Sequence, residues 1–322
     1  PAFSKSRTVG STAEGLDYSA DHRSGKTIDQ LLEALESRTA TGCLDRAILI
    51  EEVVGLIDAM GIVQKLEQLS SIGFHYRVFK ANALLYGCAI RRVRLAIVCF
   101  RDASHLARFG RGPAPTSAGA PLCSVLDATW NSFSNSPQWL WLNANHMHAA
   151  AAANALVVGM GTSETGTLHT KSNSMPIPQG DGGTFVCIDE AVAAQGARLS
   201  PRQLEEYKLW FVHNNQREPV MRRMHPTEEL AGLGWAETEW PLDAKNSAGR
   251  TARPQYEAVG ITIAPPMYRA FAARMLWAMG KPLPPGTQTA EASEPQVACK
   301  CSRAGVDYIE MVHVKPCLSR GL

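Results

Sequence analysis

Two groups of opposite charge stand at the ends of apolar segments in the first third of the chain. A carboxylate pair, Glu51-Glu52, directly follows the apolar run 47–50 (AILI), which predicts a buried strand. An arginine cluster comes just before a second apolar run, 95–100 (LAIVCF). A carboxylate can act as a general acid or bind a ring nitrogen, and guanidinium groups bind phosphate or carboxylate through paired hydrogen bonds. The two groups together therefore indicate a site for a polar, anionic ligand, whereas each alone is equally compatible with a solvated surface. The arginines of the cluster are Arg91, Arg92 and Arg94.

The residues between these groups predict the elements that position them. Apolar residues recur at helical spacing over 61–72, Gly73 is a suitable helix end, and a strand candidate follows around 76–80. A helix over 27–37, with Thr27 as its N-cap, precedes the first strand. The strand–helix–strand order predicts an α/β fold with a parallel sheet. Ligands of such sheets bind at the carboxyl ends of the strands, so we expect Glu51 and the arginines to come together.

The composition is that of a globular protein and gives no global signal for nucleic acid. The 322 residues are 45% hydrophobic and 19% charged, with a net charge of +2. No apolar run reaches the roughly 18 residues that a membrane span needs. Three of the eight cysteines, Cys88, Cys99 and Cys187, lie in or beside apolar strand candidates, which predicts buried free thiols in a reducing compartment.

Other candidate sites are weaker. His146 and His148 alternate along the chain and could bind a metal, but no third ligand is evident, so we predict surface or packing histidines and no metal site. The Cys299-Lys300-Cys301 segment lacks a standard zinc spacing. The glycine-rich segment 159–166 lacks the Lys-Ser/Thr ending of a phosphate-binding loop. Near the N-terminus, a polar loop carries three possible phosphate donors, namely Ser4, Lys5 and Arg7.

The rest of the chain divides by composition. Residues 106–199 are rich in Gly, Ala, Ser and Pro and predict a loop-rich insert. Helices are expected at 200–210, at 226–234 with two glutamates in its first turn, and at 267–279. Residues 283–322 predict a partly disordered tail with a strand-like segment at 308–314.

Four segments, in order, resemble motifs of the DNA cytosine-5 methyltransferases. Residues 50–56 (IEEVVGL) resemble the family's Glu-Asn-Val motif, and 85–95 (LYGCAIRRVRL) its Tyr-Gly-Val-Pro-Gln-x-Arg-x-Arg motif. Residues 222–228 (RRMHPTE) are similar to Arg-x-Leu-Thr-Pro-x-Glu, and 260–266 (GITIAPP) to the closing Gly-Asn-Ser/Ala-Val/Ile-x-Pro-Pro motif. Residues 1–4 (PAFS) and 15–17 (GLD) look like the remainder of the nucleophile motif, which would place the catalytic cysteine and the glycine-rich cofactor loop upstream.

The resemblance implies a fold and a domain division. The fold would be α/β, a partial Rossmann-like S-adenosylmethionine-dependent methyltransferase sheet with a small loop-rich target-recognition insert. Residues 1–105 would form part of the catalytic core, 106–199 the target-recognition region, and 200–282 the return to the core, with 283–322 as the tail. An intracellular protein is expected, nuclear in a eukaryote.

The resemblance also implies roles for single residues in methyl transfer from S-adenosylmethionine to carbon 5 of a flipped cytosine. Glu51 would bind the ring N3 and the exocyclic amine, with Arg92 and Arg94 holding Glu51, the cytosine O2 or nearby phosphates. Gly260 and Ile261 would contact the cofactor. Contacts to DNA would come from Ser4, Lys5, Arg7 and Arg91.

The sequence departs from the family in three motifs. Glu52 replaces the Asn beside the catalytic acid, Ala89-Ile90 replace Pro-Gln, and Ile261 replaces the cofactor-pocket Asn. We therefore expect this chain to be inactive alone and to need DNA and a complementing polypeptide with the nucleophile as partners. Two alternatives stay open: a non-catalytic DNA-binding or scaffold remnant of that family, and an unrelated α/β enzyme acting on an anionic small molecule.

Overall fold

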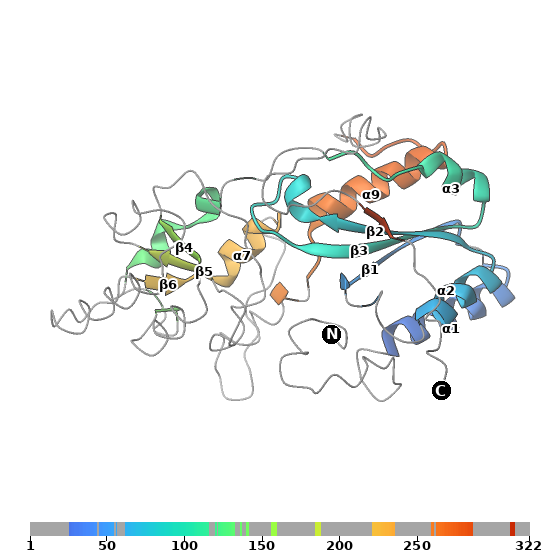
Figure 1. The fold of residues 1–322 in the computed structure, drawn as a ribbon, viewed down its shortest axis with the longest axis horizontal. Coiled ribbons are helices and arrows are strands. Elements are labelled where there is room, and N and C mark those ends of the chain that lie inside the picture. The colour runs from blue at the N-terminus through green and yellow to red at the C-terminus, as the bar shows by residue number, and fades with distance from the viewer. Residues whose placement is uncertain are drawn as a thin grey trace, which may run out of the picture. The chain divides into compact units, whose positions relative to one another are not determined.

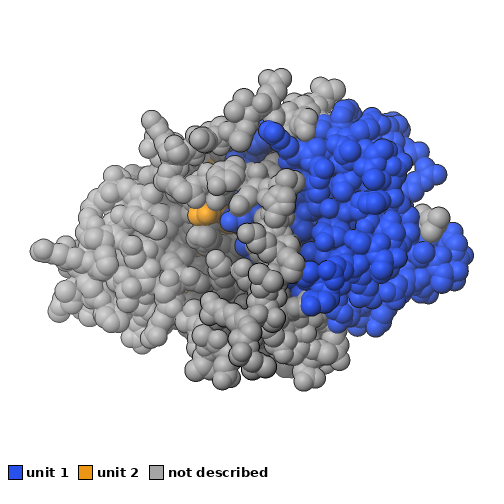
Figure 2. All heavy atoms as spheres, turned by 45° about the vertical axis from the view of Figure 1, so that its right-hand side comes forward, with its two compact units in different colours: residues 1–85, 93–116, 267–322 blue, residues 86–92, 117–266 orange. Residues whose placement is uncertain are grey.

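The computed structural model divides the chain into two compact units, coloured separately in Figure 2. Unit 1 comprises Pro1–Leu85, Val93–Thr116 and Met267–Leu322, and unit 2 comprises Tyr86–Arg92 and Ser117–Pro266. Each unit is described by itself. The residues that the structure describes are 26–43, 45–54, 56, 62–115, 120, 122–132, 136, 140–141, 156–159, 184–187, 221–235, 259–260, 262–285 and 310–312.

Unit 1 is built on a four-stranded sheet in the order β1-β3-β2-β7 (Figure 1). Its strands are β1 (Ala47–Glu52), β2 (His75–Asn82), β3 (Val93–Phe100) and β7 (Glu310–Val312). Every neighbouring pair is antiparallel. β1 and β2 run in the same direction, as the strand–helix–strand order predicts, because both are antiparallel to β3. The expected parallel pairing is nevertheless wrong, since β3 lies between them.

Helices cover both faces of this sheet (Figure 1). α1 (Lys26–Ala40) and α2 (Ile62–Ser71) pack on the face that carries Val78, Ile97 and Cys99. α3 (Ala103–Phe109) and α9 (Pro265–Ala278) lie on the other face. There, Phe79 packs against Phe109 and Phe271 with ring centroids 5.5 and 5.8 Å apart. The sheet is therefore the middle layer of three, with an aliphatic core on one face and an aromatic core on the other.

Most elements expected in unit 1 are confirmed. The helix over 61–72, the strand around 76–80 and the strand-like segment 308–314 appear as α2, β2 and β7. Gly73 follows α2 with φ +94°, a backbone conformation that favours glycine. The N-cap at Thr27 is wrong, because α1 already begins at Lys26. Cys88 and Cys99 are buried free thiols as predicted, whereas the side chain of Cys187 lies outside the described residues.

Two buried or partly buried arginines of unit 1 donate hydrogen bonds to backbone carbonyls of neighbouring segments. Arg101 donates to the carbonyl oxygens of Asp45 at 3.1 Å and Ile72 at 2.7 Å, and its guanidinium lies 4.4 Å from the centroid of the Phe74 ring. Arg274 of α9, only 2% exposed, donates to the carbonyls of Arg108 and Phe109. Hydrogen bonds from charged donors are stronger than neutral ones, so each guanidinium stabilises chain turns that sheet pairing leaves unsatisfied.

Unit 2 contains a small sheet and the short helix α7 among its described residues. β4 (Leu156–Gly159) is parallel to β5 (Thr184–Cys187), which is antiparallel to β6 (Met221–Arg223). The helix α7 (Pro226–Gly232) confirms the helix expected from 226 to 234. Two 3-10 turns precede the sheet, η4 (Leu122–Val125) and η5 (Ala128–Asn131), and η3 (Ala83–Leu85) lies in unit 1. The helix expected at 200–210 lies outside the described residues.

The end of α7 forms hydrogen bonds with the loop 86–92. The carbonyl of Gly232 accepts hydrogen bonds from the amides of Ala89 at 2.9 Å and Ile90 at 3.2 Å. Gly234 has φ +87°, and a Cβ built on it would lie 2.5 Å from the ring of Pro266. Glycine is therefore required at 234 both for its conformation and for the close approach of Pro266.

We predict that Gly234→Ala lowers the free energy of unfolding by roughly 2–4 kcal/mol, since positive φ and overpacking add. Gly42→Ala is the matched control, because Gly42 has φ +76° but a Cβ added to it would meet no atom of the described residues within 4 Å. That control should cost only about 1 kcal/mol. Urea denaturation followed by circular dichroism measures both, and equal losses would contradict a packing constraint at Gly234.

Candidate functional site

The register of β1 and β3 places Glu51 beside Arg94. Glu51 is directly opposite Ala96, and Arg94 lies two residues away along β3 on the same face of the sheet. The Arg94 Nε is 3.0 Å from the Glu51 Oε1, with 19% and 26% of the side chains exposed. The Arg94 Nη1 also donates to the carbonyl of Val93 at 2.9 Å. Arg94 therefore holds the Glu51 carboxylate in one orientation at the partly exposed end of the edge strand β1.

Glu52 has a different environment because strand residues alternate between faces. It points to the face of Ile48 and Ile50, which packs against the α1–α2 core. The Glu52 Oε2 accepts a hydrogen bond from the Val53 amide at 3.2 Å. Burial, with a smaller contribution from the charge of Glu51, raises the pKa of Glu52 to about 7 against the opposing effect of the Val53 amide. Near neutral pH this carboxyl group is thus partly protonated and can donate as well as accept a hydrogen bond.

Arg92 has another set of contacts. Its side chain is 2% exposed, and its Nη2 donates to the carbonyl oxygens of Gly260, at 3.1 Å, and Thr262. The structure thus brings Arg94 to Glu51, while Arg92 contacts the backbone ahead of α9. Arg91 is partly buried. Four predicted site residues, Ser4, Lys5, Arg7 and Ile261, lie outside the described residues.

Gly260 lies beside open space. Among the described residues, a Cβ built on it would meet no atom within 4 Å, unlike at Gly232 and Gly234, where it would meet Ile90 and Pro266. The amide of Thr262 donates to the carbonyl of Val259 at 3.3 Å, so the backbone turns at this point. The open side of Gly260 is compatible with a ligand that lies directly against the main chain.

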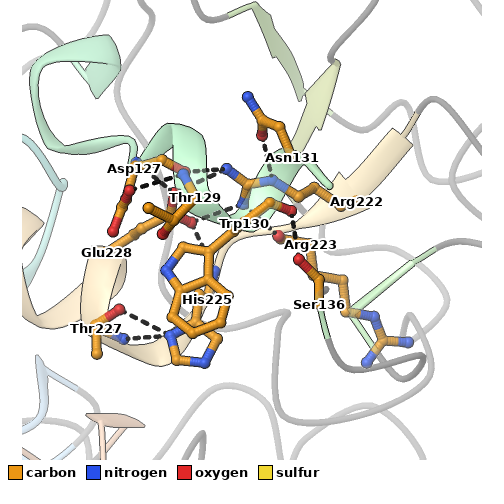
Figure 3. A network of polar contacts seen from close by, with 10 residues as sticks. All are labelled: Asp127, Thr129, Trp130, Asn131, Ser136, Arg222, Arg223, His225, Thr227 and Glu228. Carbon is orange, nitrogen blue, oxygen red and sulfur yellow. Dashed lines mark hydrogen bonds and ion pairs between the residues drawn. The ribbon is translucent and has the colours of Figure 1, made fainter. Parts of the chain in front are cut away.

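A second polar cluster in unit 2 is centred on Arg222 (Figure 3). Its two terminal nitrogens are each 2.8 Å from an oxygen of Glu228, and both side chains are at most 1% exposed. The Glu228 carboxylate also accepts hydrogen bonds from the amides of Asp127 and His225, each at 2.7 Å. Arg222 Nε donates to the Asn131 side chain at 2.8 Å. Because the paired charges are surrounded by further hydrogen bonds, the cluster joins β6, α7 and η5 into one framework.

His225 belongs to this framework as the N-cap of α7. Its Nδ1 accepts from the Thr227 amide at 3.3 Å, and its ring stacks on Trp130 with centroids 3.8 Å apart and planes 13° from parallel (Figure 3). Burial lowers the pKa of His225 to about 4, helped by the charge of Arg222. The imidazole is therefore neutral at physiological pH and acts here as a packing and capping group.

The sequence indicates only part of these two clusters. The motif 222–228 contains both Arg222 and Glu228, but the sequence alone predicts no contact between them. The sequence does not predict three further members of the Arg222 cluster, namely Asp127, Trp130 and Asn131. Nothing near them in the sequence indicates a partner about 100 residues away.

Neither a metal site nor a membrane span is found in the part of the chain that the structure describes. No three side chains of His, Cys, Asp or Glu gather there as metal ligands would. Within the same residues, no helix combines the length and apolar character needed to cross a membrane. The pairs His146/His148 and Cys299/Cys301 lie outside the described residues.

Comparison with known proteins supports the fold. No family model matches the chain, and no curated protein matches its sequence. The structure is similar to the Entamoeba histolytica methyltransferase EhMeth, with a TM-score of 0.55 and 13% identity over 79% of this chain and 70% of that one. It is similar to a mutant of Spodoptera frugiperda DNMT2, with a TM-score of 0.52 and 13% identity over 74% and 68%. The S. pombe Dnmt2 methyltransferase gives a TM-score of 0.55 and 12% identity over 79% and 73%.

At these identities the likeness shows the fold. The predicted α/β fold class is thus confirmed: the chain has a Rossmann-like fold, similar to that of these methyltransferase structures.

We predict that Glu52→Gln removes a pH-dependent loss of stability. The pKa of Glu52 is about 7 in the folded chain, above its ordinary value of 4.5. Its contribution is therefore fully present below pH 4.5 and is lost as pH rises through 7, by on the order of 3 kcal/mol. The melting temperature of the variant should equal that of the wild type near pH 4.5 and should exceed it at pH 8. Glu33→Gln, at an exposed position of α1, is the control, and a constant difference between Glu52→Gln and wild type across this pH range would contradict the prediction.

We predict that Arg222→Met destabilises unit 2 by about 3–5 kcal/mol, because Glu228 would remain buried without its cation. Adding Glu228→Gln, which removes the buried charge and keeps an oxygen for one of the two amides of Asp127 and His225, should recover part of that loss. Arg223→Met, the next residue of the same strand, should change the stability by less than about 0.5 kcal/mol. Thermal melts of these proteins and of the single variant Glu228→Gln give the coupling energy, and additive losses would show that Arg222 and Glu228 do not act as a pair.

Proposed function

We propose that this chain is the base-binding portion of a cytosine-5 methyltransferase that acts on DNA with S-adenosylmethionine. The carrying observation is the ion pair of Glu51 and Arg94 at the end of β1. Two motifs that the sequence resembles, 50–56 and 85–95, supply one member each. The pair joins them through strand register, so their proximity is independent of the motif resemblance.

The chemistry of cytosine fits a carboxyl group held in this way. The edge of the base offers an amine donor beside the N3 acceptor, and a carboxyl group can accept from the first and, when protonated, donate to the second. Arg94 fixes the orientation of Glu51, which reduces the entropy lost when a base binds. A proton shared between Glu51 and N3 would withdraw electrons from the ring and favour addition of a nucleophile at carbon 6.

Gly260 is the described residue that fits the cofactor. Its open side would let an adenosine group lie against the main chain, as the resemblance of 260–266 to the closing motif implies. S-adenosylmethionine, when bound, supplies the methyl group. The chain's contribution there would be to bind and orient the cofactor at Gly260.

The two buried thiols among the described residues do not fit the role of nucleophile. Burial raises the pKa of Cys88 and of Cys99 to about 12, so neither forms a thiolate at neutral pH. We therefore propose that the chain binds an exposed cytosine but does not transfer methyl groups by itself. A complementing polypeptide would supply the attacking cysteine.

The test compares DNA duplexes that carry one unpaired cytosine or one unpaired thymine. The wild type should prefer the cytosine duplex by about tenfold or more, since a well-placed bidentate contact discriminates by roughly 1–3 kcal/mol. Glu51→Ala should abolish the preference, and Arg94→Met should weaken it. The control Glu33→Ala, at an exposed position of α1, should leave the preference for the cytosine duplex unchanged. Fluorescence anisotropy at fixed salt measures all four, because salt alone changes such affinities.

Three outcomes would contradict parts of the proposal. Equal affinity of the wild type for the two duplexes would exclude cytosine recognition and favour a non-catalytic DNA-binding role. Binding of a phosphorylated metabolite that survives excess DNA would favour an enzyme of small anions. Transfer of labelled methyl groups from S-adenosylmethionine to DNA by the purified chain would show that it is active alone.

A further inference from the structure

Arg92 contacts a single turn of unit 2 at two points. Its Nη2 donates to the carbonyl oxygens of Gly260 and Thr262, which lie on either side of position 261. The Arg92 side chain is 2% exposed and Thr262 is 7% exposed, so these bonds are shielded from water. A charged donor in such surroundings binds a carbonyl more strongly than it would at the surface.

The same turn has a third contact of this kind. Trp235, which follows the end of α7, donates from its Nε1 to the carbonyl of Ile263 at 2.9 Å. The carbonyls of residues 260, 262 and 263 thus each accept a hydrogen bond from a side chain of another segment of the unit. Thr262 and Ile263 lie in no helix or strand, so the conformation of the turn ahead of α9 depends on Arg92 and Trp235.

We propose that Arg92 is a positioning residue for ligand binding at Gly260, rather than a group that contacts the base. Its guanidinium fixes the carbonyls on both sides of residue 261 and thereby holds the open side of Gly260 in a binding-ready conformation. This inference rests on the proposed function for the identity of the ligand, an adenosine-containing cofactor. It assigns to Arg92 the ordering of the turn that would bind the cofactor, whereas Arg94 orients the carboxylate of Glu51.

The physical consequence is a coupling between Arg92 and cofactor affinity. A turn that populates its binding-ready conformation less often binds its ligand more weakly, by the factor by which that population falls. Arg92→Met removes both hydrogen bonds while keeping an apolar side chain of similar length. Arg92→Lys keeps a charged donor that can reach a carbonyl and should restore part of the effect.

The experiment measures amide hydrogen exchange of the peptide 259–264 in the full chain, with and without S-adenosylhomocysteine. Arg92→Met should speed exchange there by about tenfold or more, Arg92→Lys by less, and Trp235→Phe should also speed it. Arg101→Met is the matched control, because Arg101 likewise donates to two backbone carbonyls but in unit 1. It should leave exchange at 259–264 unchanged. Titration calorimetry should show that Arg92→Met weakens S-adenosylhomocysteine binding by about tenfold, while the control does not.

The outcomes separate this inference from the proposed function. Unchanged exchange at 259–264 in Arg92→Met overturns the inference. Binding of S-adenosylhomocysteine by the wild type without protection of this peptide also overturns it, and leaves the proposed function standing. A wild type that does not bind S-adenosylhomocysteine contradicts the proposed function instead, and the assignment of Arg92 to the cofactor side falls with it.

Discussion

Both units depend on the same interaction, a buried or partly buried guanidinium group that donates to backbone carbonyls. In unit 1, Arg101 donates to carbonyls of loops and Arg274 to carbonyls at the end of α3, and in unit 2 Arg92 and Arg222 likewise donate to backbone carbonyls. Connections between strands and helices leave carbonyls without partners, and burying them unpaired costs free energy. Arginine suits this task because its fork of donors reaches several acceptors at once and remains charged. The turn at Gly260 is therefore ordered by side chains, whereas Glu51 and Arg94 are placed by strands β1 and β3.

The position of β3 between β1 and β2 brings together the residues of the candidate site. Had β2 lain beside β1 with β3 beyond it, Arg94 would have been two strands from Glu51, a separation of about 10 Å. With β3 inserted, Glu51 faces Ala96, and Arg94 reaches it along the diagonal. One strand register thus decides which of the three clustered arginines contacts the carboxylate.

The sequence predicted single helices and strands better than it predicted which strands or side chains contact one another. Periodicity located α2 and α9, and His225-Pro226 followed by two glutamates located α7, because these signals lie within one turn or two of the helix. It failed where the partner is distant. The order of the strands depends on packing of the whole sheet, and the contact of Arg222 with Asp127 and Asn131 depends on how unit 2 folds. No local pattern encodes either.

Arg92 and Arg94 show why a motif does not assign roles by itself. In a continuous strand, two residues at this spacing would have their side chains on the same face, where both could contact one ligand. β3, however, begins at Val93, so the alternation that directs Arg94 to Glu51 does not extend to Arg92. Arg92 instead ends the segment Tyr86–Arg92, whose amides at 89 and 90 bond to the carbonyl of Gly232. Fixed there, its guanidinium meets the carbonyls of Gly260 and Thr262, and the two neighbouring arginines stabilise two different parts of the molecule.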